Sequence, residues 1–275
     1  MEARFRPLSR KLLDRPQLID QIRRLIPDPD RAHLVPFMTT WDDRELAMRI
    51  GIPMYGADPA HASLGTKTEG RRLFAEAGVS HPRGREGLHS RAEVVEAIGA
   101  LRTEAPDIER VIVKHNEGVS GFGNAHVDVS SLEPVASAQR IDRLLDGLSV
   151  DPLVGDVGRY FETLAREGGI VEEVVGGEVI ESPSVQRRIT PLGRVELLST
   201  LDQILGGSSG QVFMGSRFPA HPVYAQQISR SARKVGERLA ERGVIGRFAV
   251  DYIVSRRGQG AWDDHAIELD LTPNR

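Results

Sequence analysis

The chain has 275 residues, of which 40% are hydrophobic, so it can form one large domain or two to three smaller ones. Its 36 Lys and Arg and 39 Asp and Glu leave a net charge of −3, which predicts no binding to nucleic acid or to an anionic membrane through charge alone. No cysteine is present, which excludes disulfides, thiolate metal ligands and a cysteine nucleophile. No apolar run is long enough to span a membrane, and we expect a soluble, cytoplasmic protein.

The first 65 residues alternate between helical and strand patterns. Leu and Ile recur at helical spacing in RKLLDRPQLIDQIRRLI, AHLVPFM is typical of a buried strand, and IPMYG is typical of a second one. Between these strands, WDDRELAMRIG predicts a helix that Asp42 or Asp43 caps and Gly51 ends. The alternation predicts a small α/β domain with a parallel sheet over residues 1–65.

The remaining residues combine helices with strands of the antiparallel type. The residue pattern predicts helices over 66–78, 90–105, 138–148, 157–169 and 226–243. The helix from residue 90 has Ser90 as its N-cap and Glu93 three positions later, as in a capping box. Strands are expected over 170–175, 178–189, 194–201, 246–254 and 264–271. The fold class we expect is therefore α/β at the start and α+β after it.

One stretch, VIVKHNEGVSGFGNAHVDV, predicts two strands joined by a glycine-rich turn. Gly118, Ser120, Gly121 and Gly123 are small enough for backbone N–H groups to approach an anion, and Lys114 can add a positive charge. No Gly-Lys-Ser/Thr sequence follows the glycines and a strand, not a helix, comes next, so neither a P-loop nor a dinucleotide fingerprint is present. An ordinary hairpin with a flexible turn explains the stretch equally well.

Carboxylates are expected to gather on two later strands. Side chains alternate along a strand, so Arg247 and Asp251 share one face of GRFAVDYIV, and Glu268 and Asp270 share one face of IELDL. If these strands pair, three carboxylates converge, and a site built only of oxygen ligands suits Mg²⁺. A face that is simply solvated is the alternative.

A third stretch, IVEEVVGGE, combines an apolar strand with paired glutamates and two glycines. This composition suits a hinge between domains whose backbone could hydrogen-bond the edge of a purine. Glutamates at the end of a strand are usually just exposed, so the stretch carries little weight alone.

Taken in order, these features resemble the ATP-grasp superfamily over nearly the whole chain, and within it the pheganomycin-type peptide ligase branch. The segments that carry the resemblance include LGTKTEGRRLFAEAGVSHP, VIVKHNEGVSGFGNA, VEEVVGG, SPSVQ, LLSTLDQILGG and GVIGRFAVDYIV. The resemblance implies a pre-ATP-grasp domain over 1–65, a first lobe with a glycine-rich lid hairpin over 66–176 and a second lobe with a metal site over 177–275. In such proteins the two lobes hold ATP between them, and the hairpin closes over the triphosphate.

The resemblance also implies a role for individual residues. It implies that Lys67, Lys114 and the glycine loop bind the phosphates of ATP. The segment from Glu172 through Glu173 to Val175 would contact the adenine, and Glu181 (or Glu178) would contact the ribose. Mg²⁺ would be bound by Asp251, Glu268 and Asp270. The family's reaction forms an acyl phosphate that an amine then attacks, so the enzyme mainly positions groups and stabilises charge. Arg247 is expected to stabilise the transferring phosphoryl group, and Ser184 and Asp202 to bind substrate, although a plain strand end explains the Asp202 stretch equally well.

Three departures from the branch's pattern stand out. Phe122 replaces a glutamate in the glycine loop, Thr272 replaces an arginine after the acidic motif, and the sequence ends at Arg275 where the branch continues with a glycine-rich segment. Arg275 is expected to substitute for the missing arginine. The leading interpretation is an ATP- and Mg²⁺-dependent carboxylate–amine ligase whose partners are a small-molecule or peptide acid and an amine. The alternatives are a small-molecule kinase of the same fold and a nucleotide-binding pseudoenzyme that recognises a peptide partner. A homodimer is the expected oligomer, since it is the commonest one among soluble enzymes.

Overall fold

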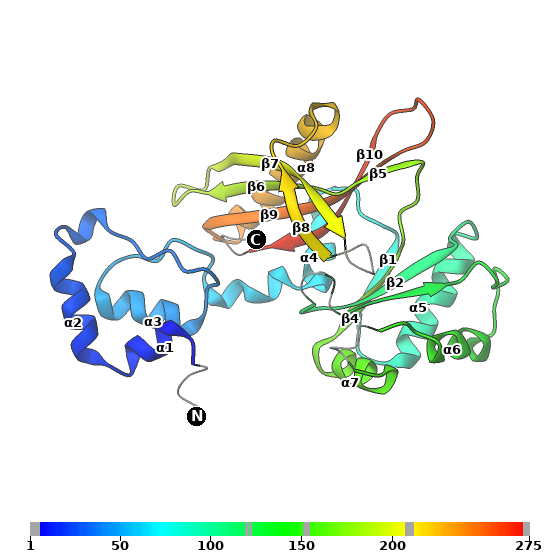
Figure 1. Cartoon of the computed structure of the whole chain (residues 1–275), viewed down its shortest axis with the longest axis horizontal. Coiled ribbons are helices and arrows are strands. Elements are labelled where there is room, and N and C mark those ends of the chain that lie inside the picture. Colours follow the sequence, from blue (N-terminus) through cyan, green and yellow to red (C-terminus); the bar gives the residue numbers. More distant parts are fainter. Residues whose placement is uncertain (1–5, 119–120, 122, 151–154, 207–211, 272–275) are drawn as a thin grey trace.

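The computed structural model describes residues 6–118, 121, 123–150, 155–206 and 212–271. Figure 1 shows a group of short helices at one end, followed by two separate sheets with helices packed on their outer faces. The N-terminal group holds α1 (Leu8–Leu13), α2 (Pro16–Leu25), η2 (Pro29–Arg31), α3 (Trp41–Ile50) and η3 (Pro59–Gly65). Its small core consists of Leu13, Ile19, Leu46 and Ile50.

The N-terminal parallel sheet that we predicted is reduced to one bridge. Among the described residues before residue 66, Leu34 pairs in parallel with Met54, and the backbone N–H of Leu34 donates to Pro53 at 2.9 Å. Pro36 and Pro53 lack the N–H donor that a longer ladder needs, so the pairing stops there. The prediction of two full strands is therefore wrong, whereas the parallel direction is right.

The sequence pattern predicted some helix boundaries correctly and others not. The stretch with helical spacing over residues 10–26 belongs to two helices, because Pro16 begins α2 and leaves Asp14 and Arg15 as a break. The N-cap of α3 is Thr40 rather than Asp42 or Asp43, and Asp43 completes a capping box with it. Gly51 ends α3 in a left-handed conformation, as predicted.

The first sheet has the strand order β1-β4-β2-β3 and is antiparallel throughout. Helices α5, α6 and α7 pack on one of its faces and form a continuous core with Val111, Val113, Val127 and Val171. Ser90 caps α5, as predicted. The elements are β1 (Gly84–Leu88), α5 (Arg91–Glu104), β2 (Arg110–His115), β3 (Asn124–Asp128), α6 (Ala138–Asp146), α7 (Val157–Glu167) and β4 (Gly169–Glu173).

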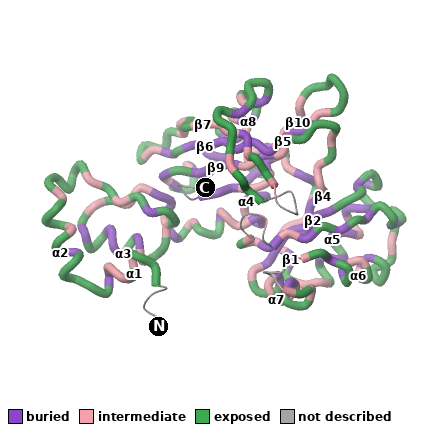
Figure 2. Tube along the Cα trace, in the orientation of Figure 1, coloured by how far each residue is buried: buried purple, intermediate pink, exposed green. Residues whose placement is uncertain are grey.

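The second sheet has the order β10-β9-β6-β7-β8, with β5 also paired to β9, and all its described pairs are antiparallel. Helix α8 covers one face, where Phe248, Val250, Tyr252 and Val254 are buried, and Figure 2 shows the buried strands at this centre. The elements are β5 (Val179–Glu181), β6 (Pro183–Ile189), β7 (Val195–Gly206), β8 (Val212–Arg217), α8 (Pro222–Glu241), β9 (Gly246–Arg256) and β10 (Asp263–Asp270).

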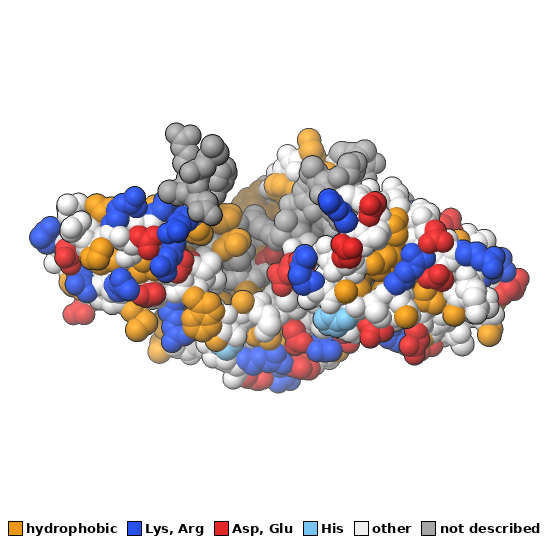
Figure 3. Space-filling model, turned by 90° about the horizontal axis from the view of Figure 1, so that it is seen from below, with side chains coloured by type: hydrophobic (Ala, Val, Ile, Leu, Met, Phe, Trp, Pro, Cys, Tyr) orange, Lys and Arg blue, Asp and Glu red, His pale blue; other side chains and the backbone are white. Residues whose placement is uncertain are grey.

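Helix α4 (Lys67–Glu76) connects the two sheets. It packs against β1 and β4 of the first sheet and against β10 and α8 of the second. Leu73 and Phe74 point inward, and both belong to the core of the second sheet. Positive and negative side chains are interspersed on the face of the molecule in Figure 3, which agrees with the near-balanced composition.

Candidate active site

A cavity of about 660 Å³ lies between the inner faces of the two sheets. The first sheet contributes Ile112, Lys114, Asn124, His126 and Glu172, and the second contributes Ser184, Gln186, Gln203, Asp251, Glu268 and Asp270 among others. Strand alternation explains the division, since the intervening Val113, Val171, Val185 and Val250 all point into the cores behind. Each sheet therefore has an apolar outer face under its helices and an inner face of mixed polar and apolar side chains toward the cavity.

Lys114 and Glu172 form a buried ion pair in the wall of the first sheet. Glu172 is 2% exposed, and it also accepts from the Arg71 guanidinium at 3.0 Å. Arg71 in turn donates to the Pro82 carbonyl at 2.9 Å and lies 3.3 Å from Glu86. Buried charges require such partners, because an uncompensated one is strongly destabilising. Glu172 is thus already paired with two cations, which the sequence did not predict.

Lys67 connects the glycine loop to the second sheet. Its ammonium donates to the Gly118 carbonyl at 2.6 Å and lies 3.4 Å from Oε1 of Glu268. The Lys67 side chain is 6% exposed. Lys67 is the first residue of α4, and Thr66 caps this helix. Asn116, which the sequence analysis did not single out, accepts from the Thr68 backbone at 3.0 Å and from its hydroxyl at 2.8 Å. These bonds hold the base of the loop against the start of α4.

The glycine hairpin has the geometry that the sequence predicted. Strands β2 and β3 pair antiparallel with Lys114 opposite Asn124 at the loop end. Gly121 lines the cavity with φ +83°, and Gly123 has φ +85°, with His115 Nδ1 3.0 Å from where a Cβ would stand. Glycine is therefore required at 123 by both backbone and space. Ser120 and Phe122 lie outside the described residues.

His115 and His126 flank Lys114 in different environments. His115 is 4% exposed and its Nε2 lies 3.0 Å from the Tyr160 carbonyl, so it is part of the buried wall and not an exposed loop residue. Burial lowers the pKa of His115 and favours its neutral form. His126 lines the cavity from β3, and partial burial together with Arg110 and Lys114 lowers its pKa.

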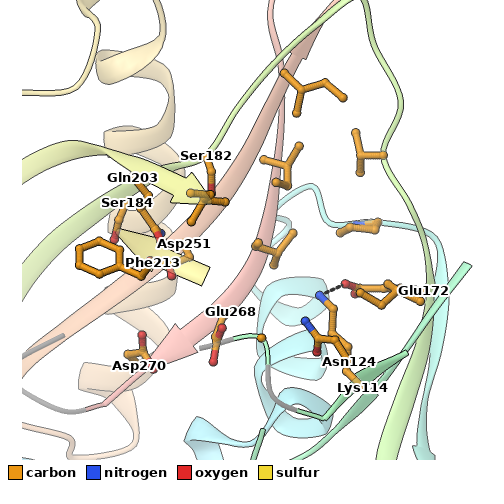
Figure 4. A pocket seen from close by; sticks show the side chains of 18 of the residues that line it. Lys114, Asn124, Glu172, Ser182, Ser184, Gln203, Phe213, Asp251, Glu268 and Asp270 are labelled. Carbon is orange, nitrogen blue, oxygen red and sulfur yellow. Dashed lines mark hydrogen bonds and ion pairs between the residues drawn. The ribbon is translucent and has the colours of Figure 1, made fainter. Parts of the chain in front are cut away.

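The three carboxylates of the acidic motif all line the cavity (Figure 4). Asp251 of β9 pairs directly with Glu268 of β10, and Ser184 of β6 lies on the other side of Asp251. A bulge between Ala266 and Glu268 lets Ile267 and Glu268 both reach the cavity. Within the described residues, no group of three or more His, Cys, Asp or Glu is close enough together to form a complete metal site.

The predicted hinge lies at the edge of the cavity. Glu173, Val174 and Val175 all line it, and Glu173 is held by Arg83 at 2.8 Å. Two hydrogen-bonded carboxylates, Glu173 and Asp107, raise the pKa of Arg83. Glu181 of β5 pairs with Val254 of β9, and Glu178 accepts from the Gly258 backbone at 3.0 Å. Neither glutamate is among the cavity-lining residues.

Other predicted site residues lie elsewhere. Asp202 points to the opposite face of β7 from Leu201 and Gln203, where it accepts from the His221 backbone at 2.9 Å and from the Tyr224 hydroxyl at 2.8 Å. Burial and this bond to Asp202 raise the pKa of Tyr224. Arg247 shares the Asp251 face as predicted, but it is exposed and outside the cavity lining. Arg275 and Thr272 lie outside the described residues.

Comparison with known proteins settles the family. A family model described as "IQCH-like, ATP-grasp" matches residues 59–146 and 156–272, which together make up most of the chain. The chain belongs to the ATP-grasp family. The predicted membership is thereby confirmed, and so is the mixed α/β fold with antiparallel sheets.

Two curated ATP-grasp relatives extend the comparison. The chain is 32% identical over 270 residues, 97% of its length and 53% of the relative, to an L-propargylglycine–L-glutamate ligase of Streptantibioticus cattleyicolor. It is 26% identical over 290 residues, 93% of its length and 27% of the relative, to IQ motif-containing protein H of Danio rerio. The chain therefore spans about half the length of the first relative and about a quarter of the second.

The ATP-grasp fold is also found in solved structures. A biotin carboxylase–β,γ-ATP complex from Campylobacter jejuni superposes with a TM-score of 0.64 at 15% identity, covering 94% of this chain and 52% of the other. At this identity the similarity concerns the fold.

None of the helices in the described part of the chain has the length and apolar character to cross a membrane.

Proposed function

We propose that this chain binds ATP with Mg²⁺ in the cavity and uses it to join a carboxylate to an amine. The observation that carries the proposal is the opposition of Lys114 and Gly121 of the glycine hairpin to Asp251, Glu268 and Asp270 across the cavity, with Lys67 between Gly118 and Glu268. Cations and loop amides suit the phosphates, and carboxylate oxygens suit divalent ions. The similarity to a ligase of 32% identity supports the same reaction class.

The carboxylates fit Mg²⁺ in spite of the absence of a preformed group of three among the described residues. Mg²⁺ is usually bound by one or two carboxylates together with substrate phosphates and water. Asp251 and Glu268, which lie opposite each other in register, would hold it with Asp270 nearby, and the ion would neutralise phosphate charge. An incomplete set of protein ligands among the described residues is compatible with an ion that also binds a nucleotide.

The reaction that we propose, on the strength of the family resemblance, has two steps. A carboxylate oxygen of the acid attacks the γ-phosphorus and ADP leaves, giving an acyl phosphate; an amine nitrogen then attacks the acyl carbon and phosphate leaves. Lys67 and Lys114 would hold the phosphates, and the backbone of Glu173, Val174 and Val175 would contact the base. Closure of the hairpin would exclude water, which otherwise hydrolyses an acyl phosphate. Gly118, Gly121, Gly123 and Ser184, which also belong to the predicted set, would make further contacts with the nucleotide and the substrate.

We propose a division into residues 1–65, 66–176 and 177–275; the three separate hydrophobic cores support three units, although the packing does not follow the boundary at residue 66. The boundary at residue 66 cuts through packing, since Leu64 precedes it and Leu73 follows it in the core of the second sheet. Helix α4 would thus move with the second lobe when the cavity closes.

The test is an acid-plus-amine panel with ATP and Mg²⁺, in which ADP, free phosphate and product mass are all measured. A ligase gives ADP, phosphate and an amide in equal amounts. A phosphorylated product without free phosphate identifies a kinase instead, and tight nucleotide binding with no ADP across the panel identifies a pseudoenzyme.

A further inference from the structure

One end of the cavity has an apolar wall. Leu205 of β7 pairs directly with Phe213 of β8, and Leu201 lies on the same face of β7. Phe37, from the N-terminal group, also lines the cavity. Phe213 is 51% exposed and Leu205 is 37% exposed, so both present apolar surface that a bound molecule could cover.

This wall lies beyond the carboxylates as seen from the nucleotide side. Figure 4 shows Lys114 and Glu172 on one side of Glu268 and Asp251, and Phe213 on the other. In phosphoryl transfer the attacking oxygen lies roughly in line with the leaving one, on the far side of the γ-phosphorus from ADP. With the nucleotide placed as proposed above, the acid substrate would lie at the end of the cavity that Phe213 lines.

The polar groups at this end carry no positive charge in the described part of the lining. Lys114 is the one Lys or Arg side chain among the described lining residues, and it lies across the cavity in its ion pair with Glu172. Near Leu205 and Phe213 the lining offers the neutral Gln203 and Ser216, which are paired to each other in register. An acidic side chain placed here would lose its hydration without gaining a cation.

We infer that the acid substrate carries an apolar side chain, which packs against Leu205 and Phe213 while its carboxylate faces Asp251 and Glu268 across the metal. This inference rests on the proposed function, because it needs the nucleotide in the orientation described there. An apolar side chain would cover exposed apolar surface of both residues. One methylene in such a pocket is worth about tenfold or more in discrimination, so selectivity over a charged acid of equal size is measurable.

The test is calorimetric binding of L-leucine and L-aspartate, which have side chains of similar size, to the full chain saturated with Mg²⁺ and a non-hydrolysable ATP analogue. We expect L-leucine to bind at least about tenfold more tightly. Phe213→Arg should remove this preference or reverse it, and its half-exposed position allows the variant to fold. Met214→Arg is the matched control, since Met214 is 65% exposed and outside the cavity lining, and it should keep the wild-type preference.

Equal binding of the two acids, tighter binding of L-aspartate or binding of neither would overturn the inference. So would an unchanged preference in Phe213→Arg. ADP release in the acid-plus-amine panel reports separately on the proposed function. Turnover with charged acids only would keep the ligase and remove the apolar subsite, whereas failure of the nucleotide analogue to bind would remove both.

Discussion

Lys67 joins the two sides of the cavity, because its ammonium donates to the Gly118 carbonyl at 2.6 Å and lies 3.4 Å from Glu268. One side chain thus contacts the glycine loop and the acidic motif, which are far apart in the sequence. A bound triphosphate would offer the same ammonium a stronger acceptor than the Gly118 carbonyl. We therefore expect Lys67 to matter both for nucleotide affinity and for the coupling of the loop to the metal site.

Lys67→Met should lower the affinity for the ATP analogue at least about tenfold, because hydrogen bonds to charged groups contribute about 1.5–3 kcal/mol. Fluorescence titration with a labelled analogue measures the change. Arg72→Met, on the same helix but exposed and paired with Glu69, is the control and should bind like the wild type. Equal affinity of the Lys67 variant and the control would contradict a phosphate contact.

The two cations on Glu172 should separate binding from stability. Lys114→Ala leaves Glu172 paired with Arg71, so we expect weaker nucleotide binding and a modest loss of stability. Arg71→Ala removes the ion at the centre of the network and should lower the free energy of unfolding by about 3 kcal/mol, since breaking a buried pair costs that much. Urea denaturation and nucleotide titration of both variants give the comparison. If Lys114→Ala bound nucleotide normally, the role of the hairpin in phosphate binding would be ruled out.

The acidic motif should make nucleotide binding depend on Mg²⁺. Asp251→Asn combined with Glu268→Gln keeps the size of both side chains and removes their charge, so affinity should become the same with Mg²⁺ and with EDTA. Asp263→Asn, at the exposed start of β10, is the control and should retain the metal dependence of the wild type. A normal Mg²⁺ effect in the double variant would place the metal elsewhere.

We expect Asp202 to stabilise the fold and not to bind the substrate. Asp202→Ala leaves the Tyr224 hydroxyl and the His221 N–H without their acceptor, and we expect a loss of about 2 kcal/mol in unfolding free energy. Tyr224→Phe removes one of the two bonds and should cost less. Thermal and urea unfolding measure both, while the KM for the acid substrate should stay unchanged in Asp202→Ala. A large rise in that KM would restore Asp202 to the substrate site.

Stability should fall at acidic pH because of His115. Its pKa is lowered in the folded state by burial, so the unfolded state takes up a proton first as the pH falls. The neutral ring's contribution is complete above the unfolded pKa of about 6.5 and is lost as the pH falls from there through the folded pKa. His115→Gln should show a smaller loss of unfolding free energy between pH 7 and pH 5 than the wild type. An equally steep loss would show that other groups are responsible.

Much of the second half of the molecule could be predicted from residue patterns. Strict alternation in GRFAVDYIV placed Asp251 on the face opposite Val250 and Tyr252, and the structure has this arrangement. The glycine hairpin was equally clear, since the turn residues and flanking apolar strands agree. Such signals are local, and tertiary packing reinforces them.

The predictions that failed depended on longer-range information. Asp202 and Gln203 adjoin in one strand, and only the packing of α8 decides which of them faces the cavity. The burial of His115 at the end of β2 could not be predicted either, because it depends on Tyr160, which comes from a helix 45 positions later. Arg71 showed no signal because its partners, Glu172 and Pro82, come from other elements. Phe213 lies on a strand that the sequence analysis missed altogether.

The most direct test of the account is a crystal structure of the chain with a non-hydrolysable ATP analogue and Mn²⁺, whose anomalous signal locates the ion. The account predicts the triphosphate between Lys67, Lys114 and the glycine hairpin, with Mn²⁺ bound to Asp251 and Glu268 and the base beside Val174. A nucleotide bound outside this cavity, or an ion away from those two carboxylates, would contradict it.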